Sequence, residues 1–149
     1  MNSKYEISTK ENREFLKASC EELLNFGHRF PSPNGGSYYL GDDGTPWKDR
    51  NRETWITCRM AHVYSLGLML GHEGSGELAD AALKGLKGEL HDEKNGGWYA
   101  GVTPEGDIVP NKQCYAHAFV ILAASSALTA GRPGAKELLE EALAVYDRY

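Results

Sequence analysis

The sequence predicts an all-α protein built as a partial α/α-toroid, a ring in which inner helices line the centre and outer helices cover them. Three observations predict this fold: the composition, two helices almost without charge, and an internal repeat. Valine and isoleucine together number only 9 of 149 residues, against 15 alanines, which disfavours a sheet protein. A chain of this length forms one domain, so residues 1–149 are expected to belong to a single toroid.

Composition and charge also exclude several classes of protein. The formal net charge is −5, from 16 basic and 21 acidic residues, which argues against a nucleic-acid-binding surface. No apolar run is long enough to span a membrane, and the N-terminus lacks the apolar stretch of a secretory signal. Cys20, Cys58 and Cys114 fit no zinc spacing and are expected to be reduced thiols. These features predict a cytoplasmic protein with no nucleic-acid or membrane partner.

The N-terminal third is expected to contain one helix followed by a long loop. The helix covers about residues 9–28, with Thr9 as its N-cap and apolar residues at helical spacing. Residues 31–50 are rich in Gly, Pro and Asp, which is typical of a loop, and residues 38–44 suggest a short strand and turn.

The next two helices differ in their polarity. The second, about residues 52–71, has Arg59 as its single formal charge between Trp55 and Leu70, so it should be buried on all sides. The third, about residues 76–90, is amphipathic and should cover the second from outside.

The same order occurs again after a hairpin. A β-hairpin is expected near residues 96–109, where apolar residues alternate around a Pro-Glu-Gly-Asp turn. The fourth helix, about residues 112–130, has no formal charge after Lys112, and the fifth, from Ala135 to the end, is amphipathic.

An internal repeat supports the toroid. A shift of 60 residues aligns six positions of the first helical pair (Gly71, Gly74, Glu77, Leu78, Ala82 and Leu83) with identical residues of the second (Gly131, Gly134, Glu137, Leu138, Ala142 and Leu143). In a toroid the charge-poor helices would point their N-terminal ends at a central cup. Two pairs cannot close a ring, and the sequence stops within helical sequence, so we expect the N-terminal part of a toroid that is a fragment or that associates.

The candidate site residues lie on the charge-poor helices. Trp55, Arg59 and His62 share one stripe of the second helix, and the 60-residue shift puts Tyr115 in the place of Trp55. An aromatic ring beside a charged donor suits a sugar, which offers both an apolar face and hydroxyl groups. Two other interpretations remain open: Arg59 paired with a carboxylate, because a lone buried charge is costly, and Tyr115 as a core residue. His62 is expected to be a packing residue.

No motif for a metal or a cofactor is present in the sequence. The His, Cys, Asp and Glu residues lack metal-ligand spacing, no glycine-rich loop has the form that binds phosphate, and no Gly-x-Ser-x-Gly nucleophile motif occurs. We therefore expect no metal ion and no cofactor.

Three segments resemble the N-acylglucosamine 2-epimerase superfamily, in particular its bacterial aldose–ketose isomerases of the mannose and sulfoquinovose isomerase group. They read WITCRMAHVY, GGWYA and KQCYAHAF, and the likeness extends over about residues 10–149. The resemblance implies an (α/α)6 barrel in which Trp55, Arg59 and Tyr115 line the sugar site. It also implies that the segment around that site includes Lys112, Gln113 and His117, although a structural role for His117 remains open.

The resemblance implies an isomerase acting on a small sugar, of the D-mannose/D-fructose type, through a cis-enediol. Arg59 would stabilise the charge that develops on oxygen, and the acid/base histidines of the family lie on later helices outside this chain. Three alternatives stay open: a 2-epimerase with the same intermediate, a toroid glycoside hydrolase or lyase using Glu53 and Asp49, and a sugar-binding half-toroid without activity. Expected partners are a second copy or the missing C-terminal part of the barrel.

Overall fold

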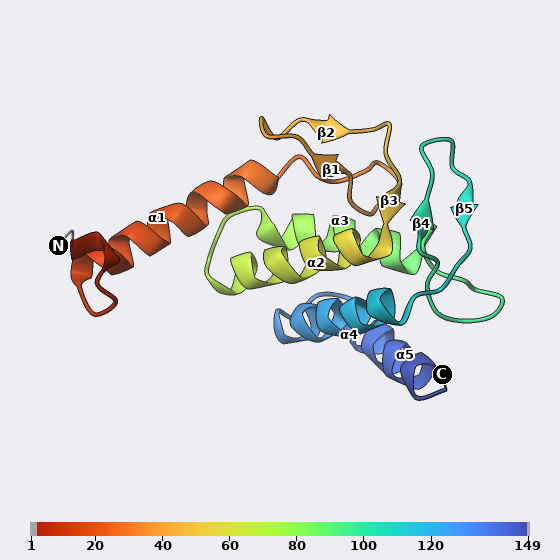
Figure 1. Ribbon diagram of the computed structural model, residues 1–149. Coiled ribbons are helices and arrows are strands. Elements are labelled where there is room, and N and C mark those ends of the chain that lie inside the picture. The colour runs from red at the N-terminus through yellow and green to blue at the C-terminus, as the bar shows by residue number, and fades with distance from the viewer. Residues whose placement is uncertain (1–2, 149) are drawn as a thin grey trace.

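The computed structural model describes residues 3–148, and this part of the chain contains the five expected α-helices (Figure 1). They are α1 (Lys10–Gly27), α2 (Thr54–Met69), α3 (Ser75–Lys87), α4 (Cys114–Thr129) and α5 (Ala135–Arg148), and a 3-10 turn, η1 (Ser3–Tyr5), precedes them. The predicted N-cap is confirmed, because the Thr9 hydroxyl accepts the Asn12 N–H at 3.1 Å. None of the described helices is long and apolar enough to cross a membrane.

Two small antiparallel sheets join the helices. The expected strand and turn form β1 (Tyr39–Leu40) and β2 (Pro46–Trp47), while the expected hairpin forms β4 (Gly101–Val102) and β5 (Ile108–Val109). A third strand, β3 (Arg52–Glu53), pairs with β4.

The prediction that the second helix begins at residue 52 was therefore wrong. Arg52 and Glu53 pair with Val102 and Gly101 as strand residues. The helix starts after them because Thr54 is held by the hairpin segment: its N–H donates to the Ala100 carbonyl at 3.0 Å and its hydroxyl to the Tyr99 carbonyl at 2.6 Å. A long-range pairing of this kind leaves no trace in local helical periodicity.

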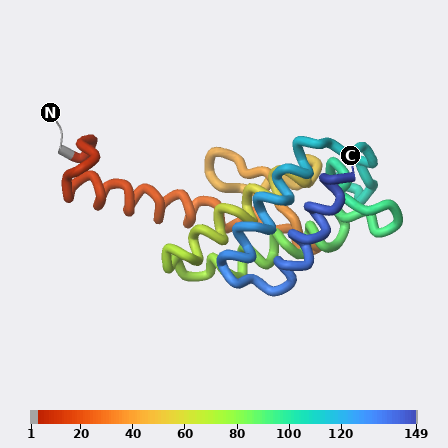
Figure 2. Tube along the Cα trace, turned by 90° about the horizontal axis from the view of Figure 1, so that it is seen from below, coloured from red at the N-terminus to blue at the C-terminus, as the bar shows by residue number. Residues whose placement is uncertain are grey.

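The helices form two layers, with α2 and α4 side by side, α3 packed on α2, and α5 packed on α4 (Figures 1 and 2). The inner helices contribute small, fully buried side chains to the core, among them Cys58, Ala61, Ala123 and Ala127. Small residues let the two helix backbones approach closely. The chain is thus an arc of an α/α-toroid, as predicted.

The inner helices are not buried on all sides, which corrects that expectation. Val63 and Leu66 of α2 and Leu122 of α4 are each about 40% exposed. No other helix of the described residues packs on these faces. Part of the charge-poor surface that was expected to be buried is therefore exposed to solvent.

The 60-residue repeat is present in the backbone itself. After α2 the His72 N–H donates to the Gly67 carbonyl at 2.9 Å, and after α4 the Arg132 N–H donates to the Ala127 carbonyl at 2.8 Å. Both corners end their helices with a glycine of positive φ, +81° at Gly71 and +68 ° at Gly131. We refer to residues 30–87 as the first repeat and residues 90–147 as the second.

Helix α1 extends away from the two layers (Figure 2). Its C-terminal end is anchored by the buried Tyr64 hydroxyl, which donates to the Leu24 carbonyl at 2.7 Å. On either side of Leu24, Leu23 and Phe26 are exposed, although the residues 60 positions later, Leu83 and Leu86, are buried in the core. Helix α1 therefore corresponds to an outer helix whose apolar face is uncovered in the described chain.

Candidate functional site

The N-terminal ends of α2 and α4 bring two aromatic rings together. Trp55 and Tyr115 are each the second residue of their helix, and their ring centroids lie 6.1 Å apart. The prediction from the repeat that Tyr115 stands at the height of Trp55 is confirmed. Trp55 is partly buried, whereas Tyr115 is 54% exposed, so the pair forms a wall open to solvent on one side.

Arg59 lies one turn farther along α2 and is surrounded by aromatic rings. Its guanidinium carbon is 4.7 Å from the centroid of the Trp55 ring and 4.9 Å from that of Phe119, and Nη2 donates to the Tyr115 hydroxyl at 3.2 Å. Among residues 3–148 no carboxylate lies within ion-pair distance of it. The alternative in which Arg59 pairs with a carboxylate is therefore absent from the described chain, and its charge faces solvent.

Phe119 belongs to this cluster and was not among the site residues predicted from the sequence. Its ring contacts that of Tyr115 edge to face, with centroids 4.9 Å apart. Two sequence signals pointed to it: it follows Tyr115 by four residues, and the 60-residue shift aligns it with Arg59. The Trp55–Arg59 pair of the first repeat is thus matched by a Tyr115–Phe119 pair in the second.

Glu53 and Tyr39 extend the cluster behind Trp55. One carboxylate oxygen of Glu53 accepts the Trp55 indole N–H at 2.9 Å and also the Tyr39 hydroxyl. Partial burial, together with the hydrogen bond to Glu53, raises the pKa of Tyr39 to about 12, so the hydroxyl remains a donor at neutral pH. No sequence signal placed Tyr39 in this cluster, because the short strand β1 is brought beside α2 only by the fold.

His117 lies apart from this cluster and is occupied by backbone contacts. Its Nδ1 bonds the Gln113 carbonyl at 2.8 Å, and its Nε2 accepts the Trp98 N–H at 3.1 Å. Since Nε2 accepts, the proton is on Nδ1, and both ring nitrogens are used. The ring is 7% exposed, so the geometry favours the structural interpretation of His117.

Lys112 is likewise bound to the glycine-rich loop between α3 and β4. Its ammonium lies 2.7 Å from the buried Asp92 carboxylate and donates to the Gly96 carbonyl at 2.5 Å. The hydrogen bond from Lys112, and further ones from Asn95, hold the pKa of Asp92 well below its usual range. Arg52 has the same role in the first repeat, where it donates to the Gly35 carbonyl at 3.0 Å.

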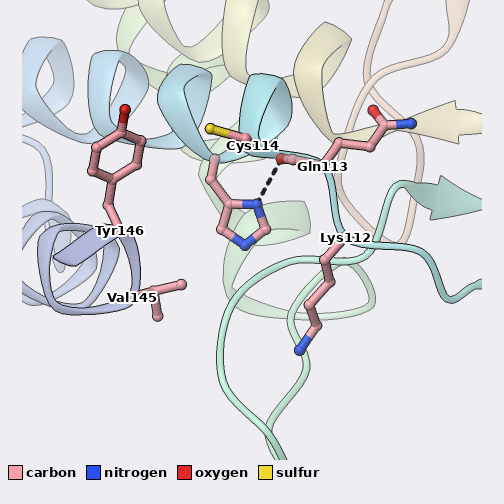
Figure 3. Close-up of a pocket in the computed structure, with 6 residues that line it drawn as sticks. Lys112, Gln113, Cys114, Val145 and Tyr146 are labelled. Atoms are coloured by element: carbon pink, nitrogen blue, oxygen red, sulfur yellow. Dashed lines mark hydrogen bonds between the residues drawn. The ribbon is translucent and has the colours of Figure 1, made fainter. Parts of the chain in front are cut away.

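Figure 3 shows an open groove between the first turn of α4 and the last turn of α5, with a volume of about 630 Å³. The residues that line it come from the two positions before α4, from α4 and from α5: Lys112, Gln113, Cys114, His117, Val145 and Tyr146. Three of the predicted site residues thus lie along this groove and three lie in the Arg59 cluster. The Gln113 side chain is exposed and makes no hydrogen bond within the described chain.

The remaining chemical groups have structural partners. His62 Nδ1 lies 2.6 Å from the Ser126 hydroxyl of α4, which confirms the expectation that it is a packing residue. Within residues 3–148 no three His, Cys, Asp or Glu side chains gather in a way that would hold a metal ion.

Comparisons with known proteins identify the family of this chain. The family model of N-acylglucosamine 2-epimerase matches residues 35–149. A D-mannose isomerase of Thermobifida fusca is 40% identical over 138 residues, which is 92% of this chain and 34% of that protein. A D-mannose isomerase of Pseudomonas cannabina pv. alisalensis is 36% identical over 139 residues, which is 93% of this chain and 33% of that protein.

Solved structures share the fold. The cellobiose 2-epimerase of Bacillus thermoamylovorans B4167 has a TM-score of 0.74 at 26% identity, covering 91% of this chain and 36% of the neighbour. A crystal structure of D-mannose isomerase has a TM-score of 0.81 at 23% identity, covering 96% of this chain and 36% of the neighbour.

The fold is an arc of the α/α-toroid of these sugar isomerases and epimerases. The chain belongs to the N-acylglucosamine 2-epimerase family. It spans about a third of the length of the relatives that it matches.

Proposed function

We propose that this chain carries part of the sugar site of an aldose–ketose isomerase that interconverts D-mannose and D-fructose. The observation that supports this most is Arg59, a cation held by aromatic rings at the N-terminal ends of two inner helices and lacking a carboxylate partner in the described chain. The two relatives at 40% and 36% identity, both named D-mannose isomerase, support the same choice of reaction.

The reaction moves a proton between two neighbouring carbons of the open-chain sugar. A base removes the proton from C2 of the aldose, the carbonyl oxygen at C1 takes up a proton, and a cis-enediol forms. The enediol then loses the proton of its C2 hydroxyl, C1 gains a proton, and the ketose results. Negative charge develops on oxygen in both steps, and a guanidinium beside that oxygen stabilises it.

Each residue of the cluster has a separate task in this proposal. The Arg59 guanidinium binds the oxygens at C1 and C2, while the Trp55 and Tyr115 rings orient the chain of the sugar against it. Lys112 and His117 hold the glycine-rich loop at residues 92–98 against the start of α4, and the exposed Gln113 lies between them in the sequence. The base, which needs a pKa near neutrality, is assigned to a histidine outside this chain. The proposed reaction uses no metal ion and no cofactor.

The test is a chimera in which this chain replaces the matching stretch of the Thermobifida fusca D-mannose isomerase. We expect the chimera to convert D-mannose to D-fructose and to retain that activity in EDTA, and the 149-residue chain alone to be inactive. Activity lost in EDTA and restored by a divalent ion would contradict the metal-free mechanism. A folded chimera that leaves D-mannose unchanged would contradict the assignment of this site to the reaction.

A 2-epimerase is the second candidate, favoured by the likeness to a cellobiose 2-epimerase at 26% identity. It would use the same enediol and return the proton to the opposite face of C2. The products separate the two: D-fructose from D-mannose indicates an isomerase, whereas D-glucose indicates an epimerase.

A further inference from the structure

We propose that Glu53 is a positioning residue of the Arg59 cluster: its carboxylate fixes the Trp55 ring and, through that ring, the place of the Arg59 guanidinium. This inference rests on the proposed function for its consequence in sugar turnover. The positioning itself can be measured without any sugar.

Two hydrogen bonds to one oxygen carry the first step. Glu53 Oε2 accepts the Trp55 indole N–H at 2.9 Å and also the Tyr39 hydroxyl. An ionised acceptor makes each of these bonds stronger than one between neutral groups. Because the indole has a single N–H, its bond to Glu53 fixes the rotation of the whole ring, and the Tyr39 ring closes the far side edge-on with centroids 6.4 Å apart.

The carboxylate is attached to a rigid frame. Glu53 pairs with Gly101 in the sheet, and a Cβ atom on Gly101 would lie 2.7 Å from the Arg52 carbonyl oxygen, so the two strands approach too closely for any other residue there. Thr54 is bound to the same hairpin segment through both its N–H and its hydroxyl. The backbone at Glu53 is thus held on both sides.

A capping hydrogen bond does not explain a glutamate at this position. Glu53 is the N-cap residue of α2, but its side chain makes no capping hydrogen bond, and Ser, Thr, Asp or Asn would serve better there. It also makes no ion pair with a lysine or arginine of the described chain. Its contacts are the two donors from Trp55 and Tyr39.

The Trp55 ring passes this constraint on to Arg59, whose guanidinium carbon lies 4.7 Å from its centroid. The second repeat lacks such an arrangement. Gln113 stands 60 residues after Glu53, and its side chain makes no hydrogen bond within the described chain. The Glu53 carboxylate therefore occurs in the repeat that carries Arg59. The second repeat, which has Phe119 in place of the arginine, has no carboxylate at the matching position.

The first experiment measures acrylamide quenching of Trp55 fluorescence in a Trp47→Phe background. Trp47 is 38% exposed and is removed, while Trp98 is 0% exposed and is shielded from the quencher, so the change reports Trp55. We expect Glu53→Ala to raise the quenching constant about twofold, because one charge-assisted bond no longer holds the ring. Glu53→Gln, which keeps an acceptor oxygen, should stay near the parent, and Tyr39→Phe should lie between them.

Glu105→Ala is the matched control, since Glu105 is an exposed carboxylate at the β4–β5 turn. An equal quenching constant for Glu53→Ala and the parent would overturn the proposal. If Glu53→Ala fails to fold, Glu53→Asp decides, because it withdraws the carboxylate from the Trp55 indole N–H by one methylene: a quenching constant equal to that of the parent would overturn the proposal.

The second experiment measures turnover in the chimera described above. Glu53→Ala should lower kcat about tenfold with the melting temperature and KM little changed, and Glu53→Gln should recover most of kcat. A fall in melting temperature with normal kcat would indicate a structural role and overturn the proposal. A chimera that is inactive without any substitution would contradict the proposed function, while the quenching result would still decide whether Glu53 positions Trp55.

Discussion

The first and second repeats have similar helix pairs and corners but carry different groups at the N-terminal ends of their inner helices. In both, a residue in the inner helix accepts an N–H from the preceding glycine-rich loop: Thr57 accepts that of Ser37 at 3.0 Å, and His117 accepts that of Trp98 at 3.1 Å. In both, a cation just before the inner helix donates to a carbonyl of that loop. One turn into the inner helix, Arg59 of the first repeat is replaced by Phe119 of the second.

This difference separates residues that hold the fold, which we call the framework, from residues of the proposed sugar site. A group found in both repeats, such as the acceptor at residues 57 and 117, serves the packing of loop against helix. A group found in one repeat, such as Arg59 with its supporting Glu53, is not required by that packing. By this criterion His117 and Lys112 belong to the framework, whereas Arg59 belongs to the proposed site.

The largest effect is expected from making the first repeat like the second. Arg59→Phe should lower kcat in the chimera by at least about 10²-fold, since a donor at a developing oxyanion typically contributes that much. The melting temperature should change little, because Arg59 is exposed and forms no ion pair in the described chain. Steady-state kinetics and thermal unfolding give the two numbers.

Arg59→Lys refines this test. It keeps the charge but loses the planar fork of donors, so kcat should fall while folding is preserved. Normal turnover with a large loss of thermal stability would show that Arg59 is a structural residue after all.

A second test compares two glycines in matching loops. Gly36 and Gly97 have nearly the same φ, +80° and +79°, but a Cβ atom would lie 3.3 Å from the Thr57 hydroxyl at Gly36 and 2.7 Å from His117 Nε2 at Gly97. Alanine adds the same backbone strain at both sites, about 1 kcal/mol. The clash with a buried ring should add about 2 kcal/mol at Gly97 alone.

Urea denaturation of Gly36→Ala and Gly97→Ala measures the two losses in the free energy of unfolding. If the losses are equal, the His117 ring yields easily, and the second repeat is less tightly packed at this point than the contacts indicate.

The features that the sequence predicted are those that depend on spacing along the chain, and the features it missed are contacts between distant segments. Helix periodicity, charge depletion and the 60-residue repeat predicted all five helices and the meeting of Trp55 with Tyr115, because these features depend on spacing along the chain. Tyr39 and the pairing of Arg52 with Val102 escaped prediction, since loops and strands distant in sequence meet there. His117 was grouped with the site by resemblance, and only the bond to the Trp98 N–H shows what its ring does.

Removing His117, the acceptor in the second repeat, should lower the stability of the fold and leave the KM for D-mannose unchanged. His117→Ala leaves the Trp98 N–H, in a fully buried residue, without its acceptor, which should lower the free energy of unfolding by about 2 kcal/mol. Thr57→Ala should cost about 1 kcal/mol in the first repeat by the same mechanism. Urea denaturation measures both. A His117→Ala chimera with unchanged stability but a raised KM for D-mannose would place His117 in the sugar site instead.

The smallest expected effect is a loss of local stability around Asp92 as the pH falls. Ser32 of the first repeat is replaced 60 residues later by Asp92, a residue 3% exposed whose carboxylate pairs with Lys112 and accepts from Asn95. These contacts hold the pKa of Asp92 in the folded chain below its ordinary value of 3.8. The unfolded chain therefore binds more protons below about pH 4, and the Asp92 contribution to stability, present above that pH, is lost as the pH falls. Hydrogen exchange at the Trp98 amide, corrected for its intrinsic rate, should accelerate between about pH 5 and pH 3 relative to the Ser37 amide. Asp92→Asn should remove this pH dependence, because an amide does not titrate. Equal pH profiles for Trp98 and Ser37 in the unsubstituted protein would show that the Lys112–Asp92 pair does not hold this loop.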